Sequence, residues 1–166
     1  MADAFLASTP AVLAPAIVSP ASGLFVDGVH LFPVRVYFED TDLSGVVYHA
    51  NYLRYMERAR SDMLRVAGID QRAAKEAGDG VYAVADIAVR YRRPARLDED
   101  LVVRSQVARV SVARCVIGQS VWRGDTQLTE GEVVVALLDP AGKPKRQPAD
   151  WIARFTALSQ GVIPLS

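Results

Sequence analysis

Apolar residues along this chain recur first with the period of a helix and then with that of a strand. Between Tyr52 and Val66 they return every three or four positions, which is typical of an amphipathic helix. Gly68 stands where that helix is expected to end, because glycine tolerates the left-handed conformation found after a helix C-terminus. The pattern predicts a long helix over residues 49–67 and a short second helix near residues 71–77.

Alternation of apolar and polar residues predicts five strands. The first covers residues 31–38, and Gly124-Asp125 supplies a hairpin turn between the last two. A terminal helix is predicted near residues 148–158, with Asp150 near its start. The other four strands follow the helices without interruption, over residues 81–92, 101–110, 112–123 and 128–138.

This order of elements predicts an α+β fold. Helices do not alternate with the strands, so a doubly wound parallel sheet is excluded. An antiparallel five-stranded sheet wrapped around one long, mostly buried helix fits the order. Strands this apolar rarely leave their edges unpaired, so a homo-oligomer, either a dimer or a dimer of dimers (a homotetramer), is expected.

Residues 1–30 differ from the rest and are expected to form a flexible N-terminal extension, followed by a single domain over residues 31–160. They contain no lysine or arginine, and Pro10, Pro15 and Pro20 interrupt their apolar residues. A secretory signal would need a basic start and an unbroken apolar core, so none is expected. No apolar stretch reaches the length of about 20 residues that crosses a membrane.

Composition narrows the classes of function. Lysine plus arginine and aspartate plus glutamate number 19 each, which gives no general attraction to nucleic acid. With Cys115 as the single cysteine and only two histidines, a metal site is not expected. Cys115 lies in an apolar run and is interpreted as a core residue. This cysteine usage fits a cytoplasmic protein.

Candidate chemistry gathers in the segment EDTDLSGVVYHANYLRYMERAR, residues 39–60, where an acidic turn precedes the long helix. A helix start presents unpaired backbone N–H groups and a partial positive charge, which together can stabilise an oxyanion. A carboxylate held beside such donors can attack, or direct water at, an activated carbonyl group. The segment therefore favours acyl transfer.

Asp42 is the candidate catalytic carboxylate, acting either as a nucleophile or as a general base, and the alternative is simple turn chemistry with Gly45. Gly45 is expected to allow the tight turn that brings Asp42 to the helix start. His49 offers either its backbone N–H as an oxyanion donor or its imidazole as a proton-transfer group.

Each remaining candidate also has a structural alternative. Glu57, about 12 Å along the helix from His49, is either a second carboxylate in the acyl pocket or the partner of Arg60 on a solvated face. Asn51 either caps the helix or hydrogen-bonds within the site. Tyr48 and Tyr52 either pack the helix or line the pocket.

Basic side chains gather at the end of the second predicted strand and just after it, at Arg90, Arg92, Arg93 and Arg96. Arg92 and Arg93 are candidates for binding the phosphates of a substrate, because guanidinium groups match phosphate oxygens. The alternative is that these side chains pair with acidic residues 98–100 at the surface.

The segments VRVYFEDTDLSGVVYHANYLRYMERAR (residues 34–60) and VRYRRPARLDED (residues 89–100) resemble the hotdog-fold thioesterases. The likeness is to the group that includes 4-hydroxybenzoyl-CoA thioesterase and the YbgC proteins associated with the Tol-Pal system, and it covers roughly residues 30–160. It implies an acyl-CoA substrate, Asp42 as the catalytic carboxylate, the N–H of His49 as the donor to the thioester oxygen, and an active site between two subunits. It implies no metal or other cofactor.

The resemblance therefore predicts an acyl-CoA thioesterase that releases a free carboxylic acid and coenzyme A. Two alternatives stay open. One is a hydratase or dehydratase of the same fold. The other is a protein without catalytic activity that binds an acyl carrier protein or a component of the cell envelope. The acyl group is open between short aliphatic, long aliphatic and aromatic classes.

Overall fold

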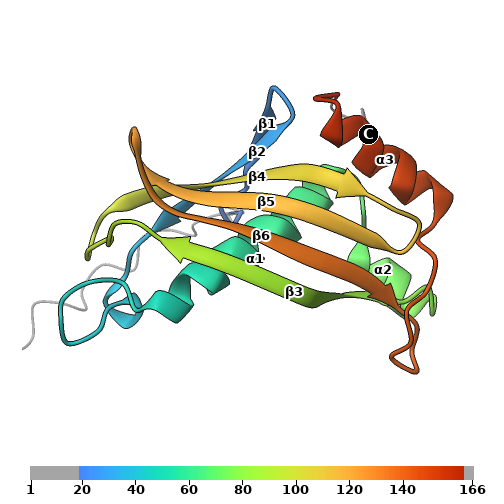
Figure 1. Cartoon of the computed structure of the whole chain (residues 1–166), viewed down its shortest axis with the longest axis horizontal. Coiled ribbons are helices and arrows are strands. Elements are labelled where there is room, and N and C mark those ends of the chain that lie inside the picture. Colours follow the sequence, from blue (N-terminus) through green and yellow to red (C-terminus); the bar gives the residue numbers. More distant parts are fainter. Residues whose placement is uncertain (1–18, 163–166) are drawn as a thin grey trace, which may run out of the picture.

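The computed structural model describes residues 19–162, which form one antiparallel sheet laid against a long helix (Figure 1). The architecture expected from the order of the elements is confirmed. In chain order the elements are β1 (Leu24–Val26), β2 (Val29–Arg35), the 3-10 helix η1 (Phe38–Asp40), α1 (His49–Val66), α2 (Gln71–Glu76), β3 (Val81–Tyr91), β4 (Asp100–Val110), β5 (Arg114–Arg123), β6 (Thr126–Leu138) and α3 (Ala149–Ser159).

The six strands pair in the order β1-β2-β4-β5-β6-β3, each antiparallel to its neighbours. Strands β4, β5 and β6 form a meander, and β6 then pairs with the earlier strand β3, which becomes an edge of the sheet. Helix α1 passes across one face, behind the strands in the view of Figure 1. Helix α3 lies beside the end of β4. None of the helices among residues 19–162 is long and apolar enough to cross a membrane.

The strand number expected from the sequence is too low by one, because β1 lies in the segment that was expected to be an extension and forms a hairpin with β2. Asp27 and Gly28 both have positive φ angles, 48° and 77°, as the favoured two-residue hairpin turn requires. The boundary at residue 30 is therefore placed too late. Residues 1–18, the remainder of the predicted extension, lie outside the described part of the chain.

The strand predicted over residues 31–38 ends early, at Arg35. The carboxylate of Asp40 accepts a hydrogen bond from the N–H of Tyr37 at 2.8 Å, and the N–H of Asp40 donates to the carbonyl of Tyr37 at 3.0 Å. These two bonds turn the chain into η1. Phe38 consequently points outward with 81% of its surface exposed, although its place in the alternation suggested the core.

Helix α1 follows its predicted course. Tyr55, Met56, Ala59 and Met63 lie on one face and are at most 1% exposed. The helix is followed by Gly68 at φ 75°, and the N–H of Ile69 donates back to the carbonyl of Leu64 at 2.9 Å, which is a glycine-based C-terminal cap.

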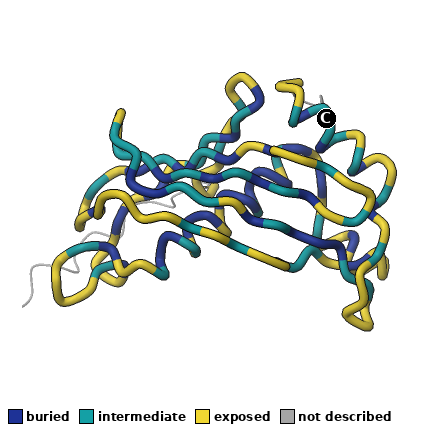
Figure 2. The backbone as a smooth tube through the Cα atoms, viewed as in Figure 1, coloured by how far each residue is buried: buried dark blue, intermediate teal, exposed yellow. Residues whose placement is uncertain are grey.

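The core beneath the sheet is divided in two by polar residues, and Figure 2 shows buried positions along the whole length of α1. One apolar cluster surrounds the first half of α1 and includes Tyr55, Leu101 and Val121, while the other joins the second half to α3 and includes Met63 and Phe155. Between them lies a set of buried polar side chains that we name the polar belt: His30, Arg60, Asp62, Ser105 and Gln119.

Hydrogen bonds satisfy most of the polar belt. Arg60 donates to Gln119 Oε1 at 2.6 Å, and Gln119 Nε2 donates to Ser105 Oγ at 2.9 Å. Asp62 Oδ2 lies 3.0 Å from His30 Nε2, while the Nδ1 atom of that ring has no hydrogen-bond partner among residues 19–162. Burial lowers the pKa of His30 and outweighs the opposing effect of Asp62. His30 is therefore held neutral in the folded chain.

The low pKa of His30 predicts a loss of stability in mild acid. The unfolded chain binds a proton at His30 near pH 6.5 and the folded chain does so only at lower pH, so the free energy of unfolding should fall as the pH drops below about 6.5. Urea denaturation at several pH values measures this. In His30→Gln, whose amide can still donate to Asp62 but does not titrate, the fall should be smaller. Equal slopes in both proteins would contradict the prediction.

Candidate active site

The site predicted from the sequence lies at one end of the sheet, where residues 37–48 lead from η1 into α1 (Figure 1). Within this loop the N–H of Asp42 donates to the carbonyl of Val46 at 3.0 Å, and the N–H of Gly45 donates to the carbonyl of Asp42 at 2.9 Å. Gly45 has a φ of 74° with open space on its side-chain side. The expectation of a tight turn at Gly45 is confirmed.

Asp42 is exposed at the tip of this turn. Its Oδ1 atom accepts hydrogen bonds from the hydroxyl and, at 2.8 Å, from the N–H of Ser44. Both bonds lower the pKa of Asp42, and the bond from the Ser44 hydroxyl has the larger effect. The nearby His49 also lowers this pKa. The turn chemistry weighed for Asp42 is thus present, and it keeps the carboxylate ionised.

The start of α1 carries no cap from its own side chains. Tyr48 occupies the capping position without a side-chain hydrogen bond, and no acidic residue lies in the first turn. The N–H groups of His49 and Ala50 donate to no acceptor in the described part of the chain. These donors and the positive end of the helix dipole are therefore available to an oxyanion.

Asn51 does not cap the helix, so the first of the two alternatives for this residue, capping, is wrong. It lies at the third helical position, and its Nδ2 atom donates to the backbone carbonyl of Asp40 at 2.9 Å. The side chain is buried and ties the first turn of α1 to the acidic loop.

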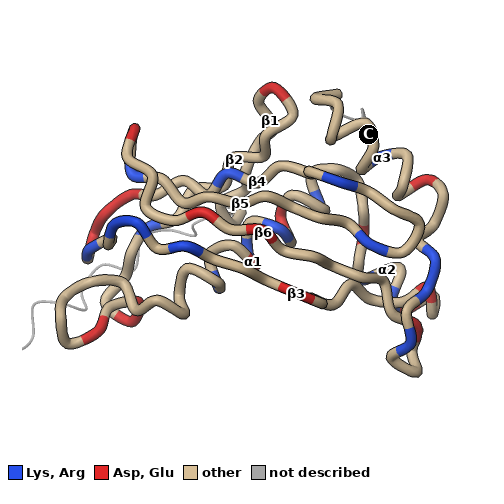
Figure 3. The backbone as a smooth tube through the Cα atoms, in the orientation of Figure 1, with Lys and Arg blue, Asp and Glu red and all other residues tan. Residues whose placement is uncertain are grey.

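A pocket of about 280 Å³ opens beside the helix start and brings together four of the predicted residues, His49, Tyr52, Arg92 and Arg93. Figure 3 shows the basic segment after β3 at the same end of the molecule as the acidic loop before α1. Asp42, Gly45, Tyr48, Asn51 and Glu57 do not line this pocket.

Tyr91 was not identified from the sequence, yet it lines the pocket and its hydroxyl donates to the carbonyl of His49 at 3.0 Å. It is the last residue of β3, next to the arginine cluster, and that position is the signal that could have revealed it. The ring of Tyr48 lies 4.5 Å from that of His49 but is itself exposed. Tyr52 is buried, and its hydroxyl accepts the N–H of Ala95 at 2.8 Å. Both alternatives for Tyr52, packing and pocket lining, therefore apply.

The arginines do not pair with residues 98–100 as the structural alternative supposed. Arg92 forms an ion pair at 2.6 Å with Glu130, which lies on the neighbouring strand β6. Glu99 and Asp100 pair instead with Arg123 and Arg35. The side chain of Arg93 is exposed and forms no ion pair within residues 19–162.

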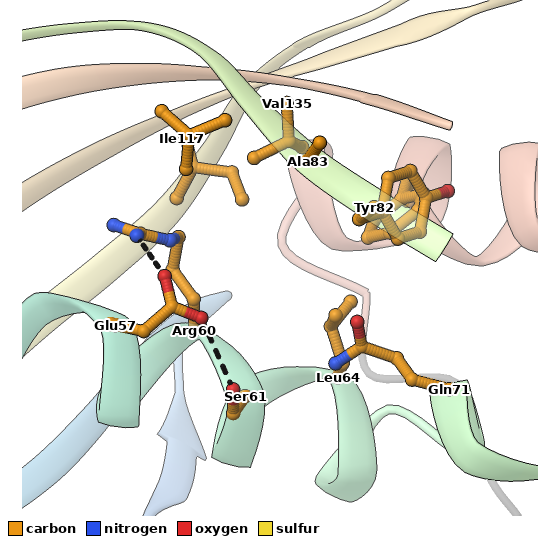
Figure 4. Close-up of a pocket in the computed structure, with 11 residues that line it drawn as sticks. Glu57, Arg60, Ser61, Leu64, Gln71, Tyr82, Ala83, Ile117 and Val135 are labelled. Atoms are coloured by element: carbon orange, nitrogen blue, oxygen red, sulfur yellow. Dashed lines mark hydrogen bonds and ion pairs between the residues drawn. The ribbon is translucent and has the colours of Figure 1, made fainter. Parts of the chain in front are cut away.

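Glu57 lies farther along α1, at two cavities between this helix and β3. It pairs with Arg60 as the sequence suggested (Figure 4). The Glu57 side chain is 58% exposed and Arg60 is buried, so only the Glu57 end of the pair lies on a solvated face. One cavity, of about 50 Å³, also contacts Ser61 and Leu64. The other, of about 510 Å³, is lined by Leu53, Val84 and Ile87 among others. Within the described residues, no three His, Cys, Asp or Glu side chains gather as metal ligands.

Similar proteins are found both by sequence and by structure. The model of the thioesterase superfamily matches residues 44–130, a span that contains the pocket residues and begins just after Asp42. The acyl-CoA thioester hydrolase YbgC of Escherichia coli is 40% identical over 126 residues, which cover 75% of this chain and 93% of that protein. The acyl-CoA thioesterase YbgC of Haemophilus influenzae is 40% identical over 131 residues, or 78% and 96% of the two chains.

A solved structure shows the same fold. The probable thioesterase from Bartonella henselae superposes with a TM-score of 0.70 at 36% identity, covering 72% of this chain and 99% of that one. The hotdog architecture expected from the sequence is thereby confirmed.

The hydrogen bonds to Asp42 predict how its charge responds to a single change. In Ser44→Ala the hydroxyl donor is lost while the N–H donor remains, so the pKa of Asp42 should rise toward its ordinary value. Titration of the carboxylate carbon by NMR measures this. Ser44→Thr keeps a hydroxyl and should leave the pKa near that of the unaltered protein. An unchanged pKa in Ser44→Ala would show that the Ser44 hydroxyl does not stabilise the charge.

Proposed function

Because this chain belongs to the thioesterase superfamily, we propose that it hydrolyses acyl-CoA thioesters to a free carboxylic acid and coenzyme A. The observation that carries the proposal is the pairing of an ionised carboxylate, Asp42, with the open N-terminus of α1. The two lie at either end of one short loop, and His49 is near enough to lower the pKa of Asp42.

In the proposed reaction the thioester oxygen accepts hydrogen bonds from the N–H groups of His49 and Ala50. As a nucleophile, Asp42 would attack the carbonyl carbon, and the C–S bond would break to release the coenzyme A thiolate. Water would then hydrolyse the resulting mixed anhydride and restore Asp42. As a general base, Asp42 would instead take a proton from the attacking water. Both routes give the same products, and in both the N–H donors stabilise the oxyanion.

The pocket beside the helix start is the proposed place for the coenzyme A end of the substrate. Arg93 supports this assignment because it lines the pocket and its guanidinium group has no ion-pair partner within residues 19–162. Within the same residues, Arg92 forms one ion pair, with Glu130. The cavities between α1 and β3 lie farther along the helix and suit the acyl group, with Leu53 and Ile87 as apolar walls and Glu57 at the far end.

A second copy of the chain is proposed to pair along β3. This strand is 11 residues long, forms an edge of the sheet, and leaves Val81 and Val84 40% and 47% exposed. An open apolar edge of this length favours pairing with another strand. A partner here would also shield the cavities along α1 and β3 from water, as a site for apolar acyl groups requires.

Replacement of Asp42 tests the proposed reaction. Asp42→Asn keeps the size of the side chain and removes the nucleophile or base, so kcat for thiol release from acyl-CoA should fall about 100-fold to 10,000-fold with little change in KM. Thiol release is measured across short, long and aromatic acyl-CoA substrates. A variant as active as the unaltered protein would eliminate Asp42 as the catalytic group. Incorporation of ¹⁸O from labelled water into Asp42 during a single turnover would identify the nucleophilic route.

Replacement of the pocket arginines tests how coenzyme A binds. Arg93→Ala should raise KM for acyl-CoA about threefold to tenfold while kcat changes little, because a phosphate contact acts equally on the ground state and the transition state. Arg90→Ala is the matched control, since Arg90 is an exposed arginine near the end of β3, three residues before Arg93, and lies outside the pocket. A fall in kcat at constant KM in Arg93→Ala would contradict a role in phosphate binding.

A further inference from the structure

Asp40 is a buried carboxylate within an otherwise exposed loop. It is 6% exposed, whereas the side chains of its neighbours Phe38, Glu39 and Asp42 face solvent. Burial of a carboxylate is costly unless hydrogen bonds compensate it. The reaction proposed above uses neither the charge nor the carbonyl of Asp40, so its burial needs another explanation.

The carboxylate of Asp40 lies between the start of the loop and the buried face of α1. Its Oδ2 atom accepts the N–H of Tyr37 at 2.8 Å, which holds the turn at η1. On the other side is the hydroxyl of Tyr55, a fully buried residue of α1. Burial first, and the neighbouring Asp40 second, raise the pKa of Tyr55. The hydroxyl therefore stays protonated and able to donate, with the Asp40 carboxylate as its neighbouring acceptor.

The backbone carbonyl of Asp40 makes the second connection. It accepts the N–H of Tyr48 at 2.9 Å and Nδ2 of Asn51, also at 2.9 Å. Tyr48 is the capping residue of α1, and Asn51 belongs to its first turn. Asp40 is thus hydrogen-bonded to Tyr37 at the start of the loop, to Tyr48 at its end and to Asn51 in the first turn of α1.

The position of Asp42 depends on this junction. Asp42 follows Asp40 by two residues. The turn that carries it is also fastened to the segment after β3, by the N–H of Val47 to the carbonyl of Ala95 at 2.9 Å. Toward α1, however, the hydrogen bonds of the loop within the described residues are those of Asp40. The contacts of Asp40 are therefore what hold the turn against α1. A displacement of about 1 Å in a reacting group can reduce a rate by about 100-fold.

We propose that Asp40 is a positioning residue for thioester hydrolysis, which sets the distance between the Asp42 carboxylate and the N–H donors at the start of α1. This inference rests on the function proposed above. Asn51 is its partner in that role, because its Nδ2 atom donates from the first turn of α1 to the backbone carbonyl of Asp40.

The test compares kcat and KM for one acyl-CoA substrate in three single variants and one double variant. Asp40→Ala should lower kcat about tenfold to 100-fold and leave KM within twofold, because coenzyme A binds elsewhere. Asp40→Asn can still accept the N–H of Tyr37 and should recover most of kcat. Asn51→Ala should lower kcat as Asp40→Ala does, and the double variant should lose little more than either single variant, because both changes release the same junction.

The matched control is Glu39→Gln, a neutralisation of the adjacent carboxylate, which is exposed and should leave kcat unchanged. Thermal unfolding establishes that each variant is folded at the assay temperature, and Asn51→Ala carries the test if Asp40→Ala does not fold. A kcat within twofold of the unaltered protein in the folded variants overturns the inference, as does full additivity of the two losses. If Asp42→Asn is inactive while these variants are active, only the positioning role fails; if Asp42→Asn is itself fully active, the proposed reaction fails as well.

Discussion

The packing of α1 on one face of the sheet fixes the rest of the molecule. Its buried face, which includes Tyr55, Met56, Ala59 and Met63, cannot shift along the sheet without exposing apolar surface, and each large side chain contributes about 1.5–3 kcal/mol by its burial. Gly68 ends the helix at one side of the sheet. The other end is thereby held next to the last residue of β3, with its N–H donors facing outward. The scaffold thus places the donors, and a short loop has only to place the carboxylate.

The polar belt shows that this core is not purely hydrophobic. Burial of Arg60 and Asp62 opposes folding, and their hydrogen bonds at best offset that cost. What the belt does provide is register, because each polar side chain of α1 matches a partner at one position of the sheet and at no other. Arg60 meets Gln119 on β5, and Asp62 meets His30 on β2. A helix moved by one turn would separate both side chains from these partners on the sheet.

The sequence predicted the local elements well and the tertiary contacts less well. The bounds of α1 followed from the spacing of apolar residues and from Gly68, and the loop with Asp42 and Gly45 followed from its composition. The edge position of β3 could not be predicted, because it results from the return of β6 to an earlier strand. The hairpin at Asp27-Gly28 carried a clear turn signal, but β1 is only three residues long and its alternation is too brief to detect. Tyr91 and Asn51 donate to backbone carbonyl groups distant in the sequence, and no pattern along the chain reports such contacts.

The division of the core into two apolar clusters separates the demands that stability and catalysis place on this chain. The cluster under α3 contains no residue of the pocket at the start of α1, although Leu64 also lines the smaller cavity proposed for the acyl group. Substitutions there can adjust resistance to heat while the catalytic end keeps its geometry. A lineage adapting to a new temperature could therefore change one compartment and conserve the other, and an engineer could do the same.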